Sequence, residues 1–328
     1  MKFRIPKIRI PLWVTLLPLV AGGLGWWHLW QGYAEELRGS LAQILPEGTD
    51  IQLSGFPYRL EAKVDGLALS QRTAALSGEL SASQLTVHRV PWQRNRQVLT
   101  LMQPDIELGV MPLRFARTRL RAPSAIASLH LEGAQIARLS VVWEQPLIAA
   151  AFLPSPARAE KFEAHFRDTP ANTTPAPETN ADQARADIVL LGEDLRFGAG
   201  SPVQLDLRAS ITAKAPLHRF ADWQTGGTLR VETFTLSDAG GEILRFHGSL
   251  KPDAQGGLQI RGEVATRCPT TLRAAVVGQR AGPEKRTRKI LTLPVSGQFP
   301  QGIILPPQDP SRPAPPVRGQ EADCPALR

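Results

Sequence analysis

The apolar positions of the chain follow two different patterns, which meet near residue 48. Residues 10–30 contain no charged side chain and are rich in leucine, valine and tryptophan. A helix of this length would be about 31 Å long, which matches the hydrocarbon thickness of a bilayer. We therefore predict a transmembrane helix over residues 10–30. A short amphipathic helix over residues 33–45 is predicted to follow, with an apolar side formed by Leu37, Leu41, Ile44 and Leu45.

The residues that flank this run predict its orientation. The tail before it, residues 1–9, is basic, whereas the first basic residue after it is Arg38. Under the positive-inside rule the tail lies in the cytoplasm and the body of the protein lies outside it. The basic residues of the tail are Lys2, Arg4, Lys7 and Arg9. Four aromatic residues at the far end of the run are predicted to lie at the membrane interface: Trp26, Trp27, Trp30 and Tyr33.

A cleavable signal peptide is the alternative to an uncleaved anchor. Its apolar region would be shorter and would end in small residues, for which Ala21-Gly22-Gly23 is a weak candidate. Apolar and aromatic residues continue past this point. The continuation favours a signal anchor that stays attached to the protein.

Beyond residue 48 apolar and polar residues alternate, as in β-strands with one wet face. Turns rich in Asp and Gly at 238–241 and 253–257 predict hairpins. Helix is scarce, because only 216–223 and 270–277 offer room for a helical turn or two. The predicted fold is mainly β, with an extended antiparallel meander after the transmembrane helix. The predicted strands cover residues 50–54, 59–64, 84–90, 98–102, 105–110, 117–121, 128–132, 135–144, 203–214, 228–236, 243–251 and 258–264.

Composition divides the body into segments. A stretch rich in Pro, Thr, Asn and Ala, residues 168–185, has no large apolar residue and is predicted to be a flexible linker. It separates a first β half, 31–167, from a second β half, 186–306. The Pro-rich residues 307–328 are predicted to form a disordered tail.

Alternation also places large apolar residues together on single strand faces, although few helices are predicted to cover them. In a sandwich such faces would bury one another. In an open, curved sheet they would form an apolar trough that a lipid or a protein partner covers. The sequence leaves both arrangements open, as it does the oligomeric state and the identity of any ligand. The residues concerned are Leu85, Val87, Leu244, Phe246, Leu258 and Ile260.

The net charge of +8 and the pI near 10 raise nucleic acid as a partner. Much of this charge is local, however, in the N-terminal tail and in a basic cluster at 285–289. Because basic residues before an apolar run are a topology signal, we predict a membrane partner and no nucleic acid.

The chain has two cysteines, Cys268 and Cys324, and each precedes a proline. Both are therefore expected on extended or turn backbone. An isolated pair in an oxidising compartment often forms a disulfide, whereas in a reducing one it stays as two free thiols. The sequence leaves these two alternatives open.

Catalytic and metal-binding motifs are not evident. The six histidines are scattered, and none has a second histidine three or four positions later. H-E-x-x-H, G-x-S-x-G and P-loop sequences do not occur. We predict no cofactor, no metal site and a protein that is not an enzyme.

Three motifs carry a resemblance. Gly55-Phe56-Pro57-Tyr58-Arg59 opens the β body, Pro91-Trp92-Gln93-Arg94-Asn95-Arg96 leads into the strand at 98–102, and a Gly-rich hairpin covers 240–260. With the anchor before them, these motifs resemble a bacterial envelope family catalogued as domain of unknown function 2125, across most of residues 10–265. The resemblance implies an inner-membrane, single-pass protein with a periplasmic body, and it brings no activity. In style the strands are also similar to the AsmA-like proteins, which shield lipids in long β grooves.

These patterns predict a non-enzymatic, membrane-anchored envelope protein that presents an apolar sheet face to a lipid or a protein partner. A structural or scaffolding membrane protein without a ligand is the first alternative. An enzyme that acts on an envelope substrate, with a site assembled from distant residues, is the second.

Overall fold

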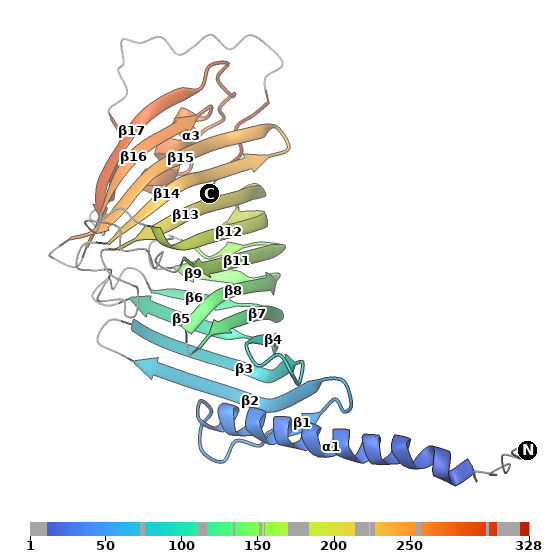
Figure 1. The fold of residues 1–328 in the computed structure, drawn as a ribbon. Coiled ribbons are helices and arrows are strands. Elements are labelled where there is room, and N and C mark those ends of the chain that lie inside the picture. The colour runs from blue at the N-terminus through green and yellow to red at the C-terminus, as the bar shows by residue number, and fades with distance from the viewer. Residues whose placement is uncertain are drawn as a thin grey trace, which may run out of the picture.

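Figure 1 shows the computed structural model of the 328-residue chain. The structure describes residues 12–72, 76–110, 117–133, 135–150, 153, 155–169, 184–213, 223, 227–253, 257–299, 302–306 and 322–327. A long N-terminal helix lies across one end of a tall antiparallel sheet, and a short helix lies near the other end. The protein is mainly β, as the alternating pattern predicts.

The described helices are α1 (Leu12–Ala42) and α3 (Pro269–Val277). The first nine strands are β1 (Gln52–Ser54), β2 (Leu60–Arg72), β3 (Leu76–Arg89), β4 (Arg96–Met102), β5 (Asp105–Val110), β6 (Thr118–Arg121), β7 (Ser124–Glu132), β8 (Gln135–Glu144) and β9 (Leu147–Ala150). The other strands are β10 (Ala157–Arg158), β11 (Lys161–Asp168), β12 (Ala184–Phe197), β13 (Val203–Thr212), β14 (Thr228–Asp238), β15 (Gly241–Pro252), β16 (Leu258–Thr266), β17 (Leu291–Phe299) and β18 (Gly302–Ile304).

The N-terminal helix α1 is continuous over 31 residues. It joins the predicted span and the predicted amphipathic helix into one element. Leu37 and Leu45 are buried, as that pattern predicts, but Ile44 is 68% exposed because the helix ends at Ala42 and the chain turns there. Within the described residues, no helix combines the length and the apolarity that crossing a membrane requires. The basic tail, residues 1–9, lies outside the described residues.

The sheet pairs its later strands in simple succession, from β12 to β18. Its earlier part is more complex, because β3 pairs with β4 through Gln84↔Met102 and with β5 through Ser81↔Asp105. Ten of the described strands thereby form a closed circuit of antiparallel pairings, in the order β3, β4, β7, β8, β11, β12, β10, β9, β6 and β5. The circuit arises because β4 and β5 are successive segments of one bent strand, as are β6 and β7, β8 and β9, and β10 and β11.

The bends fall on one line across the sheet, which we call the crease. At each bend the pairing resumes in the same register after a short interruption, such as Gln103-Pro104 between β4 and β5. A residue with positive φ recurs along this line on alternate strands: Gly66 at 69°, Gln103 at 50°, Gln145 at 46° and Asp194 at 49°.

Hydrogen bonds continue across the crease. The Gln103 amide donates to the Pro123 carbonyl (2.8 Å), and the Gln145 amide donates to the Glu160 carbonyl (2.8 Å). A left-handed residue other than glycine costs roughly 1–2 kcal/mol. These backbone bonds offset that cost, because the bent backbone leaves no orphaned donor at either position.

At the crease the alternation of apolar and polar residues shifts by one position, so that the odd-numbered apolar positions of β4 are followed by even-numbered ones in β5. Leu101 in β4 and Ile106 in β5 are separated by an odd number of positions, yet both belong to the same hydrophobic core cluster. Leu120, in β6, joins them there. The apolar side of the sheet therefore faces inward on both flanks of the crease.

The linker predicted at 168–185 is shorter than expected. Asp168 ends β11 and Ala184 begins β12, and these strands pair directly with each other. Arg185 is buried, and its Nε donates to the Ala213 carbonyl (3.2 Å). The two predicted halves thus belong to one sheet, and residues 170–183 lie outside the described residues.

The prediction of a disordered tail over 307–328 is wrong for residues 322–327. Asp323 forms a β-bridge with Lys285, and Leu327 is buried against the second half of the sheet. This end of the tail is held because a covalent bond and a buried arginine fix it, as described below. Residues 307–321 lie outside the described residues.

Candidate functional site

One face of the sheet carries an uninterrupted row of apolar residues across twelve strands. Residues that oppose each other in an antiparallel pair point to the same face, so the strand registers define the row. Ala62, Val87, Ala127 and Val264 are buried, and the other members remain partly exposed. The members of this apolar row are Ala62, Val87, Leu99, Ala127, Val141, Ala164, Leu190, Leu207, Phe234, Phe246, Val264 and Leu293.

A second apolar row lies beside the first on the same face. It joins Leu85 to Leu244 through Leu101, Ala125 and Trp143 and the strands that follow them. We call the face that carries the two rows the apolar face. Helix α1 lies beneath β2 and α3 lies near β15 and β16 (Figure 1), so among the described helices neither covers the strands between.

The six residues predicted to share single faces all lie on the apolar face. Phe246 and Leu258 are partly exposed, whereas the other four are buried. The face is thus a mixture of buried and partly exposed residues. The six are Leu85, Val87, Leu244, Phe246, Leu258 and Ile260.

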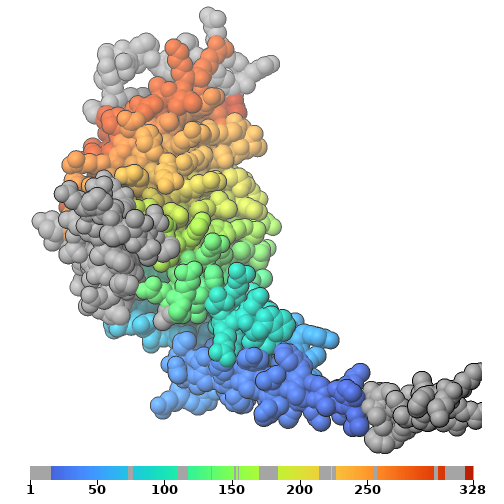
Figure 2. Space-filling model, viewed as in Figure 1, coloured from blue at the N-terminus to red at the C-terminus, as the bar shows by residue number. Residues whose placement is uncertain are grey.

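The helix α1 is fastened to the start of β2 by its tryptophans. Trp26 Nε1 donates to the Pro57 carbonyl (2.9 Å), and Trp30 Nε1 donates to the Arg59 carbonyl (3.0 Å). Trp30 also packs edge-on against Phe56, with ring centroids 5.6 Å apart. Figure 2 shows the result, in which the dark-blue helix lies against the lower end of the body.

The predicted interface aromatics therefore have different surroundings. Trp30 is 6% exposed and belongs to the core, while Trp27 is 50% exposed. Trp26 lies 6.3 Å from the ring of Trp92, and Arg94 lies over the ring of Tyr33 at 5.8 Å. The sequence motifs 55–59 and 91–96 thus meet at α1, which the sequence alone did not indicate.

The junction between α1 and the sheet contains a buried arginine. Arg89 is 5% exposed, its Nη2 donates to the Tyr33 carbonyl (3.4 Å), and its Nη2 lies 3.9 Å from Glu36 Oε1. Burial lowers the pKa of the Arg89 guanidinium, and the neighbouring Glu36 carboxylate opposes that effect. In the described part of the chain Arg89 Nε has no hydrogen-bond partner.

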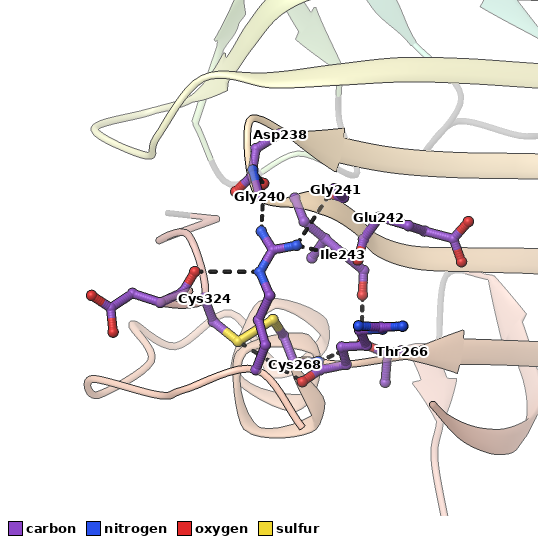
Figure 3. Close-up of polar contacts among 11 residues, drawn as sticks. Asp238, Gly240, Gly241, Glu242, Ile243, Thr266, Cys268 and Cys324 are labelled. Carbon is purple, nitrogen blue, oxygen red and sulfur yellow. Dashed lines mark hydrogen bonds and ion pairs between the residues drawn. A yellow bond between two sulfur atoms is a disulfide. The ribbon is translucent and has the colours of Figure 1, made fainter. Parts of the chain in front are cut away.

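The far end of the sheet is closed by a disulfide bond between Cys268 and Cys324, whose Cα atoms are 5.8 Å apart. Figure 3 shows this bond beside the turn between β14 and β15. The Cys324 amide also donates to the Glu284 carbonyl (2.8 Å), and Glu284 accepts hydrogen bonds from the first amides of α3. A disulfide that closes a loop of 56 residues stabilises the folded state by about 4 kcal/mol in the loop-entropy model.

Arg286 also holds the C-terminal tail at this end of the sheet, and its side chain is only 4% exposed. Its guanidinium pairs with the Asp238 carboxylate and donates to the carbonyls of Gly241 (3.2 Å) and Asp323 (3.5 Å). Within the basic cluster at 285–289, Arg286 is therefore buried and ion-paired, not exposed to solvent. Arg286 ties the tail to the β14–β15 turn.

The opposite face of the sheet carries paired charges. Hydrogen bonds from Arg119 and then Arg121 lower the pKa of the Asp105 carboxyl, and a hydrogen bond from Lys161 lowers the pKa of Glu163. Both acids are thereby held in the charged form, which suits ion pairing rather than proton donation. Among the described residues, no group of three or more His, Cys, Asp or Glu side chains is arranged to hold a metal ion.

Fold and surface together define a mainly β protein with a long helix at one end, a fastened tail at the other and an apolar face between them. The chain belongs to a family of uncharacterised proteins conserved in bacteria, DUF2125, which it matches over residues 42–292. No curated protein and no solved structure matches the chain. The family description assigns no function.

The Arg286 contacts give a prediction about stability. Replacing Arg286 with Met leaves the Asp238 carboxylate without its partner, so we expect the free energy of unfolding of the full chain to fall by about 3 kcal/mol. Urea unfolding followed by tryptophan fluorescence measures this. Arg280, which is exposed, provides the matched control. A loss of less than about 1 kcal/mol for Arg286→Met, equal to that for Arg280→Met, would contradict the role of this residue as a fastener.

Proposed function

We propose that this protein is anchored in the bacterial inner membrane through the apolar run at residues 10–30, that its body lies in the periplasm, and that the apolar face shields lipid acyl chains. The apolar row is the observation that carries the proposal. At the usual spacing of paired strands it extends for about 50 Å, which exceeds the hydrocarbon thickness of a bilayer, about 30 Å. Part of the row is packed core of the closed circuit, but Leu190 and Leu207 are partly exposed members that belong to neither core cluster, and an apolar surface of this kind calls for an occupant.

Membrane anchoring is supported by the division of α1 into two parts. Between residues 16 and 24 its large apolar side chains are exposed, and Figure 1 shows this part projecting beyond the strand ends. From Trp30 onward its inward-facing side chains are buried against the body. The exposed apolar residues are Leu16, Leu17, Leu19, Val20 and Leu24.

The periplasmic location is supported by the disulfide. Disulfides persist in oxidising compartments and are rare in the bacterial cytoplasm. The basic residues before the apolar run favour the same orientation.

Lipid is favoured over a protein partner by the chemistry of the face. The apolar row contains no polar residue across its strands, whereas protein interfaces usually combine an apolar centre with polar groups. Burial of acyl chains contributes about 0.8 kcal/mol for each methylene, so even a partly covered chain binds appreciably. A scaffold without a ligand, or an envelope enzyme, would not require so continuous an apolar surface.

The orientation is tested with C-terminal reporter fusions. We expect alkaline phosphatase fused after Arg328 to be active, because that enzyme needs the oxidising periplasm to form its own disulfides. A fluorescent protein that matures only in the cytoplasm serves as the control and should stay dark. Fluorescence from that fusion would contradict the proposed location.

The lipid proposal is tested by mass spectrometry of lipids that co-purify with the full chain in a non-ionic detergent. Leu190 and Leu207 are partly exposed neighbours on the apolar row. We expect the double change Leu190→Asn, Leu207→Asn to lower the bound lipid at least about twofold, because polar amides disfavour acyl chains. Circular dichroism should remain that of the folded protein.

A control with the same chemistry lies on the opposite face. Ile126 and Ile136 are 53% and 44% exposed there. The change Ile126→Asn, Ile136→Asn should leave the bound lipid unaltered. Equal lipid content in both variants would favour the scaffold without a ligand. The full chain is needed in this experiment, because cutting the chain at residue 31 would remove the buried Trp30.

A further inference from the structure

A basic pocket lies at the edge of the sheet where α1 leaves it. The pocket has a volume of about 510 Å³, and arginine and histidine residues line it. Among the described residues that line it, none is acidic. The basic residues are Arg59, His88, Arg89, Arg96, His130 and Arg138.

The strand registers bring basic residues directly opposite one another at this edge. Arg96 opposes His130, His130 opposes Arg138, and Arg138 opposes Arg167. Like charges in opposed positions destabilise a sheet. Within the described part of the chain, the side chains of Arg96 and Arg138 make no hydrogen bond or ion pair that would offset this repulsion.

The polar groups of the pocket floor are neutral donors. Ser128 and Ser140 line it between the arginines, and Asn95 Nδ2 lies 3.1 Å from His130 Nε2 at its rim. Guanidinium groups with hydroxyl donors between them form a surface that suits an oxyanion with several oxygen atoms. Phosphate is an oxyanion whose geometry the arginine fork matches with two parallel hydrogen bonds.

The position of the pocket identifies the source of that phosphate. Arg59, at its border, provides the carbonyl that accepts the Trp30 indole, so the pocket adjoins the point where α1 leaves the sheet. Exposed aromatic side chains cluster beside it, with Trp92 at 62% and Tyr58 at 79% exposure. Exposed aromatic and basic residues beside an apolar helix are typical of the headgroup layer.

We propose that this pocket binds the phosphate of an anionic phospholipid headgroup and holds the edge of the sheet against the membrane. The proposal rests on the membrane placement given above, but not on the presence of lipid on the apolar face. The pocket lies on the face opposite the apolar row, because Val98, Ser128 and Ser140 alternate with the members of that row along their strands.

The test measures headgroup binding to the full chain in a non-ionic detergent. Short-chain phosphatidylglycerol, short-chain phosphatidylcholine and inorganic phosphate are each titrated by calorimetry. We expect phosphatidylglycerol to bind tightest, and the double change Arg96→Gln, Arg138→Gln to weaken it at least about tenfold, because two charged hydrogen bonds are lost.

The matched control removes the same charge elsewhere. Arg158 and Arg196 oppose each other at the far strand ends, and both are exposed. The change Arg158→Gln, Arg196→Gln should leave phosphatidylglycerol binding unaltered. An equal loss in both double variants overturns the proposal, because binding would then follow net charge alone. Equal affinity for inorganic phosphate and phosphatidylglycerol overturns the headgroup assignment in favour of free phosphate.

The two proposals fail separately. Lipid that co-purifies through the apolar face should stay with the Arg96→Gln, Arg138→Gln variant. Loss of phosphatidylglycerol binding with the co-purified lipid intact supports the pocket and leaves the apolar-face proposal standing. Intact phosphatidylglycerol binding in that variant overturns the pocket proposal alone.

Discussion

Backbone geometry at the crease determines how the apolar surface of this protein is arranged. Gly66, Gln103, Gln145 and Asp194 adopt positive φ on alternate strands, and the pairings from β2 to β11 keep their register across the crease. A strand that simply continued through this line would turn every second apolar side chain outward. Because the phase of the alternation changes at the crease, both flanks direct their apolar residues to the same side, and the sheet folds about its own core.

The two ends of the sheet are finished in different ways. At the N-terminal end α1 covers β2, and indole-to-carbonyl hydrogen bonds from Trp26 and Trp30 hold the helix in place. At the C-terminal end the Cys268–Cys324 bond and the buried Arg286 hold the tail against the β14–β15 turn. At Leu190 and Leu207, in the middle of the apolar face, neither described helix lies over the sheet, and that is where we propose that lipid binds.

Much of the fold could be predicted from the sequence because alternation and Asp-Gly turns are local signals; the hairpin of β14 and β15 is an example. Strand β11 was missed although Lys161–Asp168 alternates apolar and polar residues, whereas β10 and β18 are too short to show a period. The crease was missed because Gln103-Pro104 and Gln145-Pro146 read as ordinary separators between strands. The basic pocket depends on registers between strands far apart in sequence, such as Arg138↔Arg167, which no local pattern reveals.

The central claim, that lipid covers the apolar face, is tested most directly by photo-crosslinking in intact cells. Leu190 and Val189 are neighbours in β12, both partly exposed, and they point to opposite faces of the sheet. A photoreactive phenylalanine analogue placed at each position in turn reports what lies against that face. The account predicts lipid adducts at position 190 and none at 189. Equal labelling at the two positions, or adducts at 190 with protein alone, would contradict it.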